Sequence, residues 1–232
     1  MADFLAKLKQ IEGDAKAKAS RDFSGGLDRL AAIMDVLLRR KLFLKDDDQY
    51  YCENIPQVAE DLAFTAGALD AAATLDELVM NTPNGSVHDI EVPSRHRGHI
   101  LDVKDYIHSQ LTELPDRGFS YVAWTWVPQK FYYVGRASGK GRVKHLFSHG
   151  QLSAAMNKAT TLSLLYPSQS TEDNLWDLEA ALLYLLAYVG NPPEYNTKDE
   201  AMTKARRGKK SLQALSQLFY DIACELQPEQ VR

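Results

Sequence analysis

The feature that most constrains the fold is a change of hydrophobic period at Pro115-Asp116-Arg117-Gly118. Before this point apolar residues recur at the spacing of an α-helix, most clearly at 27–41, and again at 57–80 and 100–114. Directly after it come two runs of aromatic and β-branched residues, at 121–127 and 131–135. Runs of this composition are typical of β-strands. The sequence therefore predicts an α+β fold in which a helical N-terminal region precedes a small sheet.

The remaining elements follow from helical periodicity and from Gly and Pro breaks. Helices are predicted at 3–18, 27–41, 57–80, 100–114, 141–156, 175–189 and 211–226, with a break at Ser24-Gly25-Gly26 and a short hairpin at 42–52. A helix followed by such a hairpin is the pattern of a winged-helix module. The chain is thus divided into a helical region at 1–115, a small α+β domain at 116–200, and a basic segment with a C-terminal helix at 201–232 that packs on this domain.

Composition narrows the class of protein. The chain has 232 residues, of which 45% are hydrophobic and 25% charged, so it is long enough to bury a substantial core. Its two cysteines, Cys52 and Cys224, lie far apart and have no metal-ligand spacing, which argues against a disulfide framework or a structural zinc site. No apolar run approaches the ~20 residues that span a bilayer, and the first residues lack a secretory leader. We expect a cytoplasmic protein with no membrane partner.

Positive charge is clustered although the net charge is −4. One basic stretch follows the second predicted strand, and a denser one covers 204–210. Clusters of Lys and Arg can neutralise phosphates even in an acidic chain. The candidate nucleic-acid contacts are Arg136, Lys140, Lys144, Lys204, Arg206, Arg207, Lys209 and Lys210.

One acid stands out because of its surroundings. Glu179 lies in the middle of the most apolar helix, with leucines on nearly every side. Burying a carboxylate is costly unless it is paired or binds a metal. The simpler alternative is a half-exposed Glu179 on a polar stripe with Asp177 or Tyr184.

Other polar side chains stand near the predicted hairpin and the helix that follows it. Tyr121 and Tyr133 occupy comparable positions on the two strands, where they present hydroxyls to one place or simply fill the faces of the sheet. Arg142, His145 and His149 have i, i+3 and i+7 spacing and share one helix face. The alternative for Arg142 is a solvated helix end.

These residues in this order resemble the GIY-YIG nuclease family. Tyr133-Val134-Gly135 is similar to the second signature, whereas Phe119-Ser120-Tyr121 keeps only the Tyr of the first. On the same basis Arg142 matches the family's helix Arg, Glu179 its metal-binding Glu, and Asn196 its late Asn. His145 is preferred over His149 as the family's helix His. The resemblance covers residues 118–198.

The resemblance implies a three-stranded antiparallel sheet with flanking helices and metal-dependent hydrolysis of DNA phosphodiesters. Glu179 would hold one Mg²⁺ (or Mn²⁺), Arg142 would bind a phosphate oxygen, and Asn196 would orient a phosphate or a backbone loop. Tyr121 would act as general base and pass its proton to Tyr133 or His145.

Three hypotheses follow. The leading one is a DNA endonuclease, such as a restriction or other defence nuclease, in which residues 1–115 and 204–210 supply DNA contacts or form a homodimer. The second is a non-catalytic nucleic-acid-binding module on the same fold, motivated by the degenerate first signature. The third is a helical protein-interaction protein.

Overall fold

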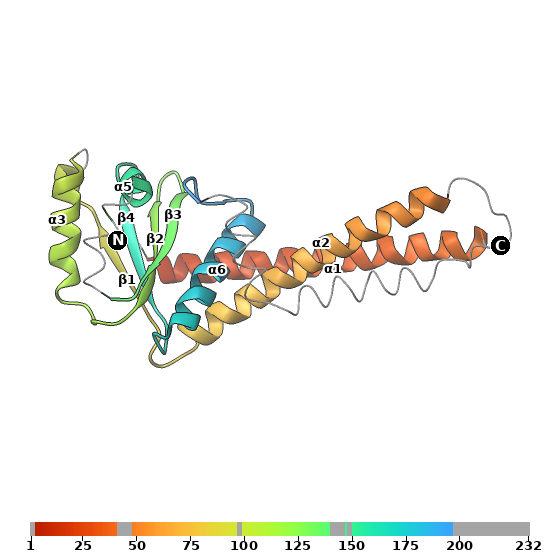
Figure 1. Cartoon of the computed structure of the whole chain (residues 1–232), viewed down its shortest axis with the longest axis horizontal. Coiled ribbons are helices and arrows are strands. Elements are labelled where there is room, and N and C mark those ends of the chain that lie inside the picture. Colours follow the sequence, from red (N-terminus) through yellow and green to blue (C-terminus); the bar gives the residue numbers. More distant parts are fainter. Residues whose placement is uncertain (1–2, 41–47, 97–98, 140–146, 148–149, 197–232) are drawn as a thin grey trace.

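The computed structural model describes residues 3–40, 48–96, 99–139, 147 and 150–196. These residues form an α+β fold with a helical N-terminal part, as predicted (Figure 1). The elements are α1 (Phe4–Arg40), α2 (Asp48–Leu75), η1 (Asp76–Met80), β1 (Ser86–Glu91), η2 (Ser94–His96), α3 (Ile100–Leu111), β2 (Phe119–Thr125), β3 (Lys130–Ala137), α5 (Gly150–Met156), β4 (Thr161–Tyr166) and α6 (Glu172–Tyr188). Within the described part of the chain, no helix is both long and apolar enough to cross a membrane.

The sheet is antiparallel and has four strands in the order β1-β4-β2-β3. The predicted hairpin is confirmed as β2 and β3, whose register places Tyr121 opposite Gly135. Two strands were not predicted: β4, which is buried along its whole length, and β1, which comes from the N-terminal region and pairs with β4. The sheet therefore has one strand more than the resemblance implies.

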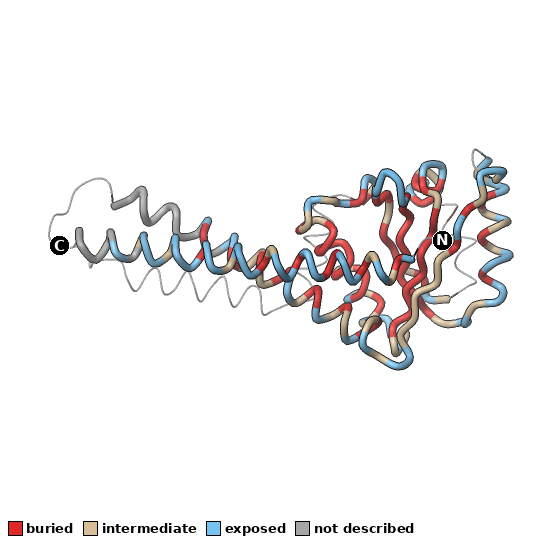
Figure 2. Tube along the Cα trace, turned by 180° about the vertical axis from the view of Figure 1, so that it is seen from behind, coloured by how far each residue is buried: buried red, intermediate tan, exposed pale blue. Residues whose placement is uncertain are grey.

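Helices cover both faces of the sheet. On one face α1, α2 and α6 pack against Val122 and Trp124 of β2, and Phe4 contacts Trp124 with ring centroids 5.3 Å apart. On the other face α3 and α5 pack against Tyr121 and Ala123. This alternation along β2 is expected of a strand buried on both sides. Figure 2 shows that buried residues concentrate in and beside the sheet, whereas α1 is mostly exposed where it extends away from it.

The first helix is longer than predicted, and the break at Ser24-Gly25-Gly26 is wrong. α1 continues through these residues as one helix beside α2 (Figure 1). A Cβ atom on Gly26 would lie 2.5 Å from Cδ2 of Leu62 in α2, so Leu62 would have to move. Gly26 is therefore a residue of close helix contact, although glycine in a sequence usually indicates a helix end.

The hairpin predicted at 42–52, and with it the winged-helix expectation, is also wrong. α2 begins at Asp48, so Tyr50, Tyr51 and Cys52 are helical, and residues 41–47 lie outside the described part. Aromatic residues suit strands by propensity, but this preference is weak and tertiary context overrides it.

Polar contacts tie the N-terminal helices to the sheet. Asp89 of β1 accepts hydrogen bonds from the Phe4 backbone N–H (2.8 Å) and from the Ser163 hydroxyl (2.5 Å). Ser163 in turn accepts a hydrogen bond from the Trp124 indole N–H at 2.8 Å. The carboxylate thus lies at the N-terminus of α1, where an anion is favourable, although burial raises its pKa.

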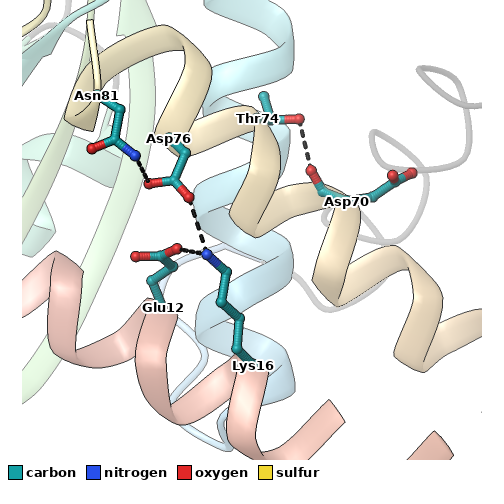
Figure 3. A network of polar contacts seen from close by, with 6 residues as sticks. All are labelled: Glu12, Lys16, Asp70, Thr74, Asp76 and Asn81. Atoms are coloured by element: carbon teal, nitrogen blue, oxygen red, sulfur yellow. Dashed lines mark hydrogen bonds and ion pairs between the residues drawn. The ribbon is translucent and has the colours of Figure 1, made fainter. Parts of the chain in front are cut away.

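A second polar network joins α1 to η1 (Figure 3). Lys16 pairs with Glu12 on its own helix and donates to Asp76 at 3.0 Å. Asp76 also accepts a hydrogen bond from the Asn81 side chain at 3.0 Å. The hydrogen bonds to Glu12 and Asp76 raise the pKa of Lys16. Because Lys16 is about half exposed, each pair contributes modestly to stability although Glu12 is buried.

Two buried tyrosines are expected to respond differently to loss of their hydroxyls. Tyr184 donates to the Phe64 carbonyl at 2.8 Å, whereas the Tyr166 hydroxyl is buried and has no hydrogen-bond partner among the described residues. Tyr184→Phe should lower the free energy of unfolding by about 1 kcal/mol, and Tyr166→Phe should leave it unchanged or raise it. Urea unfolding measures both. An equal loss in the two variants would contradict this account.

Candidate active site around strand β3

The two motif tyrosines lie on the same face of the hairpin. Their ring centroids are 6.1 Å apart; Tyr121 is buried and Tyr133 is partly exposed. A Cβ atom on Gly135 would lie 2.5 Å from the Tyr121 hydroxyl oxygen. The glycine of Tyr133-Val134-Gly135 is thus required locally, because the Tyr121 hydroxyl occupies the space of a side chain. This close approach joins the segment 119–121 to the segment 133–135.

The Tyr121 phenol is in an unusual electrostatic environment. Burial raises its pKa well above the usual value, and Tyr133 and the charge of Glu179 raise it further. Tyr121 is therefore neutral at physiological pH.

Glu179 is buried, with 3% of its surface exposed, so the half-exposed alternative is wrong. Its carboxylate lies 3.2 Å from Nε of Arg136 on β3. The Arg136 guanidinium also lies over the Trp176 ring, with Cζ 3.4 Å from the ring centroid. Pairing of this kind is what a carboxylate in an apolar helix requires.

Glu179 and the two tyrosines, Tyr121 and Tyr133, lie on different faces of the sheet. Arg136 lies opposite Ser120 in the register, and the Ser120 hydroxyl donates to the Leu175 carbonyl of α6 at 3.4 Å. Arg136 therefore belongs to the face that α6 covers, whereas Tyr121 belongs to the α3 and α5 face. The two groups therefore lie on opposite faces of the sheet, and β3 is one of its two edge strands.

Asn196 is buried against the same strand. Its side-chain oxygen accepts a hydrogen bond from the Val134 N–H at 2.7 Å, and its amide nitrogen donates to the Val134 carbonyl at 3.0 Å. The preceding residues add backbone bonds from Glu194 to Phe131 and from Tyr195 to Tyr132. The segment after α6 thus covers the outer edge of β3, and Asn196 holds the backbone of the signature itself.

The predicted site residues have different outcomes. Tyr121 and Tyr133 lie together on one face of the hairpin, Glu179 lies on the other face, and Asn196 binds the backbone of β3. Arg136, predicted as a nucleic-acid contact, points to Glu179 and keeps 25% of its side chain exposed. The remaining candidates lie outside the described residues: Lys140, Arg142, Lys144, His145, His149, Lys204, Arg206, Arg207, Lys209 and Lys210.

Sequence reasoning missed two members of this cluster. Arg136 was counted with the basic residues, and Trp176 was assigned no role. A signal was available in each case. Trp176 lies three residues before Glu179 and so shares its helix face, and Arg136 directly follows the signature glycine.

The side chains near Glu179 limit how a metal ion could bind at its carboxylate. No group of three or more His, Cys, Asp or Glu side chains is placed to hold an ion among the residues described. Mg²⁺ usually needs only one or two carboxylates when substrate phosphates and water complete its shell. The single carboxylate of Glu179 fits a cation held jointly with a phosphate substrate.

Comparisons of the chain with protein families, curated proteins and solved structures identify no related protein. No protein-family model matches the chain, and neither the curated proteins nor the solved structures contain a significant match.

Proposed function

We propose that the protein is a metal-dependent DNA endonuclease of the GIY-YIG type. The observation that carries this proposal is the close approach of the Tyr121 hydroxyl to Gly135, beside Tyr133, in a fold whose following helix buries Glu179. Three of the four antiparallel strands, β2, β3 and β4, together with the following helix that carries Glu179, support the proposal, and β1 is an addition to the sheet that the resemblance implies. DNA is the proposed partner, and α1 and α2 are proposed to contact it or a second copy of the chain.

In this proposal Glu179 provides the one protein carboxylate for Mg²⁺ or Mn²⁺. The bound ion would stabilise charge on the scissile phosphate and the leaving oxygen. Arg142 would bind a phosphate oxygen through its planar guanidinium, and His145 would accept a proton. Asn196 supports the site indirectly, because its contacts fix the backbone of β3.

The raised pKa of Tyr121 refines its role. A buried neutral phenol is a poor base, so Tyr121 first orients the attacking water through its hydroxyl. It can accept the water proton only as its own proton leaves, and Tyr133 is the nearest described phenol. The two hydroxyls would then act as a pair.

Tyr121→Phe is expected to lower the cleavage rate by about 100-fold, the lower range for a group that moves a proton in the transition state. The wild-type rate should show no inflection from Tyr121 at its ordinary pKa near 10, because burial raises that pKa. Tyr166→Phe is the matched control on the same face and should retain wild-type activity. A Tyr121→Phe variant as active as the control would contradict the assigned role.

The proposal is tested by incubating supercoiled plasmid with the purified protein and Mg²⁺, Mn²⁺, Ca²⁺ or a chelator. We expect nicked or linear products with Mg²⁺ or Mn²⁺ and none with the chelator. Intact plasmid under all metal conditions, with several DNA substrates, would refute the proposal.

A non-catalytic nucleic-acid-binding module is the second candidate. It is favoured by one observation, the low exposure of both Tyr121 and Glu179. This candidate predicts salt-dependent DNA binding without cleavage under any metal. A protein-interaction role would leave DNA unbound even at low salt.

A further inference from the structure

The contacts of Arg136 indicate a role beyond packing. Its guanidinium lies between the Glu179 carboxylate, 3.2 Å from Nε, and the face of Trp176, 3.4 Å from Cζ to the ring centroid. The carboxylate side chain is 5% exposed, whereas that of Arg136 is 25% exposed. Stacking on Trp and pairing with a carboxylate both hold the planar guanidinium in one orientation.

The position of this positive charge bears on cation binding. Glu179 is buried and its carboxylate lies 3.2 Å from Nε of Arg136, so a divalent cation at this carboxylate would lie close to the Arg136 charge. Like charges repel strongly where water is largely excluded. Without a further negative charge, Arg136 and the cation therefore compete for Glu179.

We propose that Arg136 is the counter-ion of Glu179 in the free protein and is held in place by stacking on Trp176. As a positioning residue, it makes binding of a divalent cation at Glu179 depend on the presence of the DNA substrate. The inference rests on the proposed function. In free protein Arg136 balances the carboxylate and weakens its affinity for a divalent cation. A substrate phosphate adds negative charge beside the pair, so that Arg136 and the cation can both remain. Cation and substrate thereby strengthen each other's binding.

The test measures Mn²⁺ alone binding to the full chain without DNA, from the loss of the free Mn²⁺ paramagnetic resonance signal. Arg136→Gln should bind Mn²⁺ about fivefold or more tightly than wild type, the lower bound of typical coupling between two ligands. Arg136→Lys, which keeps the charge, should stay closer to wild type than Arg136→Gln. The double variant Arg136→Gln/Glu179→Gln should lose the gain.

Trp176 variants give a second measurement that does not remove the charged pair. Trp176→Ala frees the guanidinium and should tighten Mn²⁺ binding by about threefold, the value of one cation–π contact. Trp176→Phe keeps an aromatic face and should resemble wild type. If Arg136→Gln does not fold, as circular dichroism would reveal, the Trp176 pair decides the question.

The outcomes separate this inference from the proposed function. Equal or weaker Mn²⁺ binding in Arg136→Gln and Trp176→Ala, or none in any variant, overturns the role of Arg136. If the double variant keeps the tighter binding, the ion is not at Glu179, which overturns the inference and the assigned metal ligand together. If the gain depends on Glu179 but wild type cleaves no DNA, the role of Arg136 as counter-ion stands and the nuclease proposal fails.

Discussion

Glu179→Gln is expected to reduce magnesium-dependent DNA cleavage by about 1,000-fold or more, because a metal-bound phosphate loses several kcal/mol of charge stabilisation. Glutamine has the same shape as Glu179 but lacks its negative charge. The substitution also removes the partner of Arg136. We therefore expect a loss of about 1–2 kcal/mol in the free energy of unfolding, less than for a fully buried pair because Arg136 is partly exposed.

The control for this variant comes from the same helix. Glu172 lies in the first turn of α6 and is exposed, so Glu172→Gln changes the same chemical group away from the site. Glu172→Gln should cleave at the wild-type rate. Single-turnover assays at a temperature where both variants are folded separate the loss of chemistry from the loss of stability. Equal cleavage by Glu179→Gln and wild type would contradict the assignment of Glu179.

Asn196→Ala is expected to be strongly destabilising, more so than the loss of the Glu179 charge. The substitution leaves the N–H and carbonyl of Val134 without the two bonds that Asn196 makes. A buried polar group without a partner costs about 1–3 kcal/mol, so the two together should lower the free energy of unfolding by about 2–6 kcal/mol. Urea unfolding measures the difference.

Two further variants sharpen this experiment. Asn196→Asp keeps an acceptor for the Val134 N–H but places an oxygen against the Val134 carbonyl, so it should also be destabilising. Asn157 is exposed after α5, and Asn157→Ala should change stability by less than about 0.5 kcal/mol. A loss below about 1 kcal/mol in Asn196→Ala would mean that the segment after α6 does not hold β3 as described.

Local patterns predicted the elements whose signals are strongest. The alternation at 121–127 and 131–135 predicts the hairpin of β2 and β3, and the apolar run at 175–189 predicts α6. β4 was missed because Thr161–Tyr166 is a short run buried on both faces, which periodicity cannot separate from a helix fragment. β1 was missed because Ser86–Glu91 carries four polar or charged residues and becomes a strand by pairing with β4.

The site could be predicted only in part for the same reason. The apolar neighbours of Glu179 predict a buried carboxylate that needs a partner, and its burial is confirmed. The partner, Arg136, is distant in sequence, so its identity depends on the register of β3 and on the packing of α6. The resemblance left open whether Asn196 orients a phosphate or a backbone loop, and its bonds to Val134 were not predictable because they depend on the path of the chain after α6.

The most direct measurement combines DNA cleavage with DNA binding in the same samples of wild type and Glu179→Gln, with Mg²⁺ present. The account predicts that both proteins bind DNA and that only wild type cuts it. Binding without cleavage by either protein would contradict the account and indicate a non-catalytic nucleic-acid-binding module.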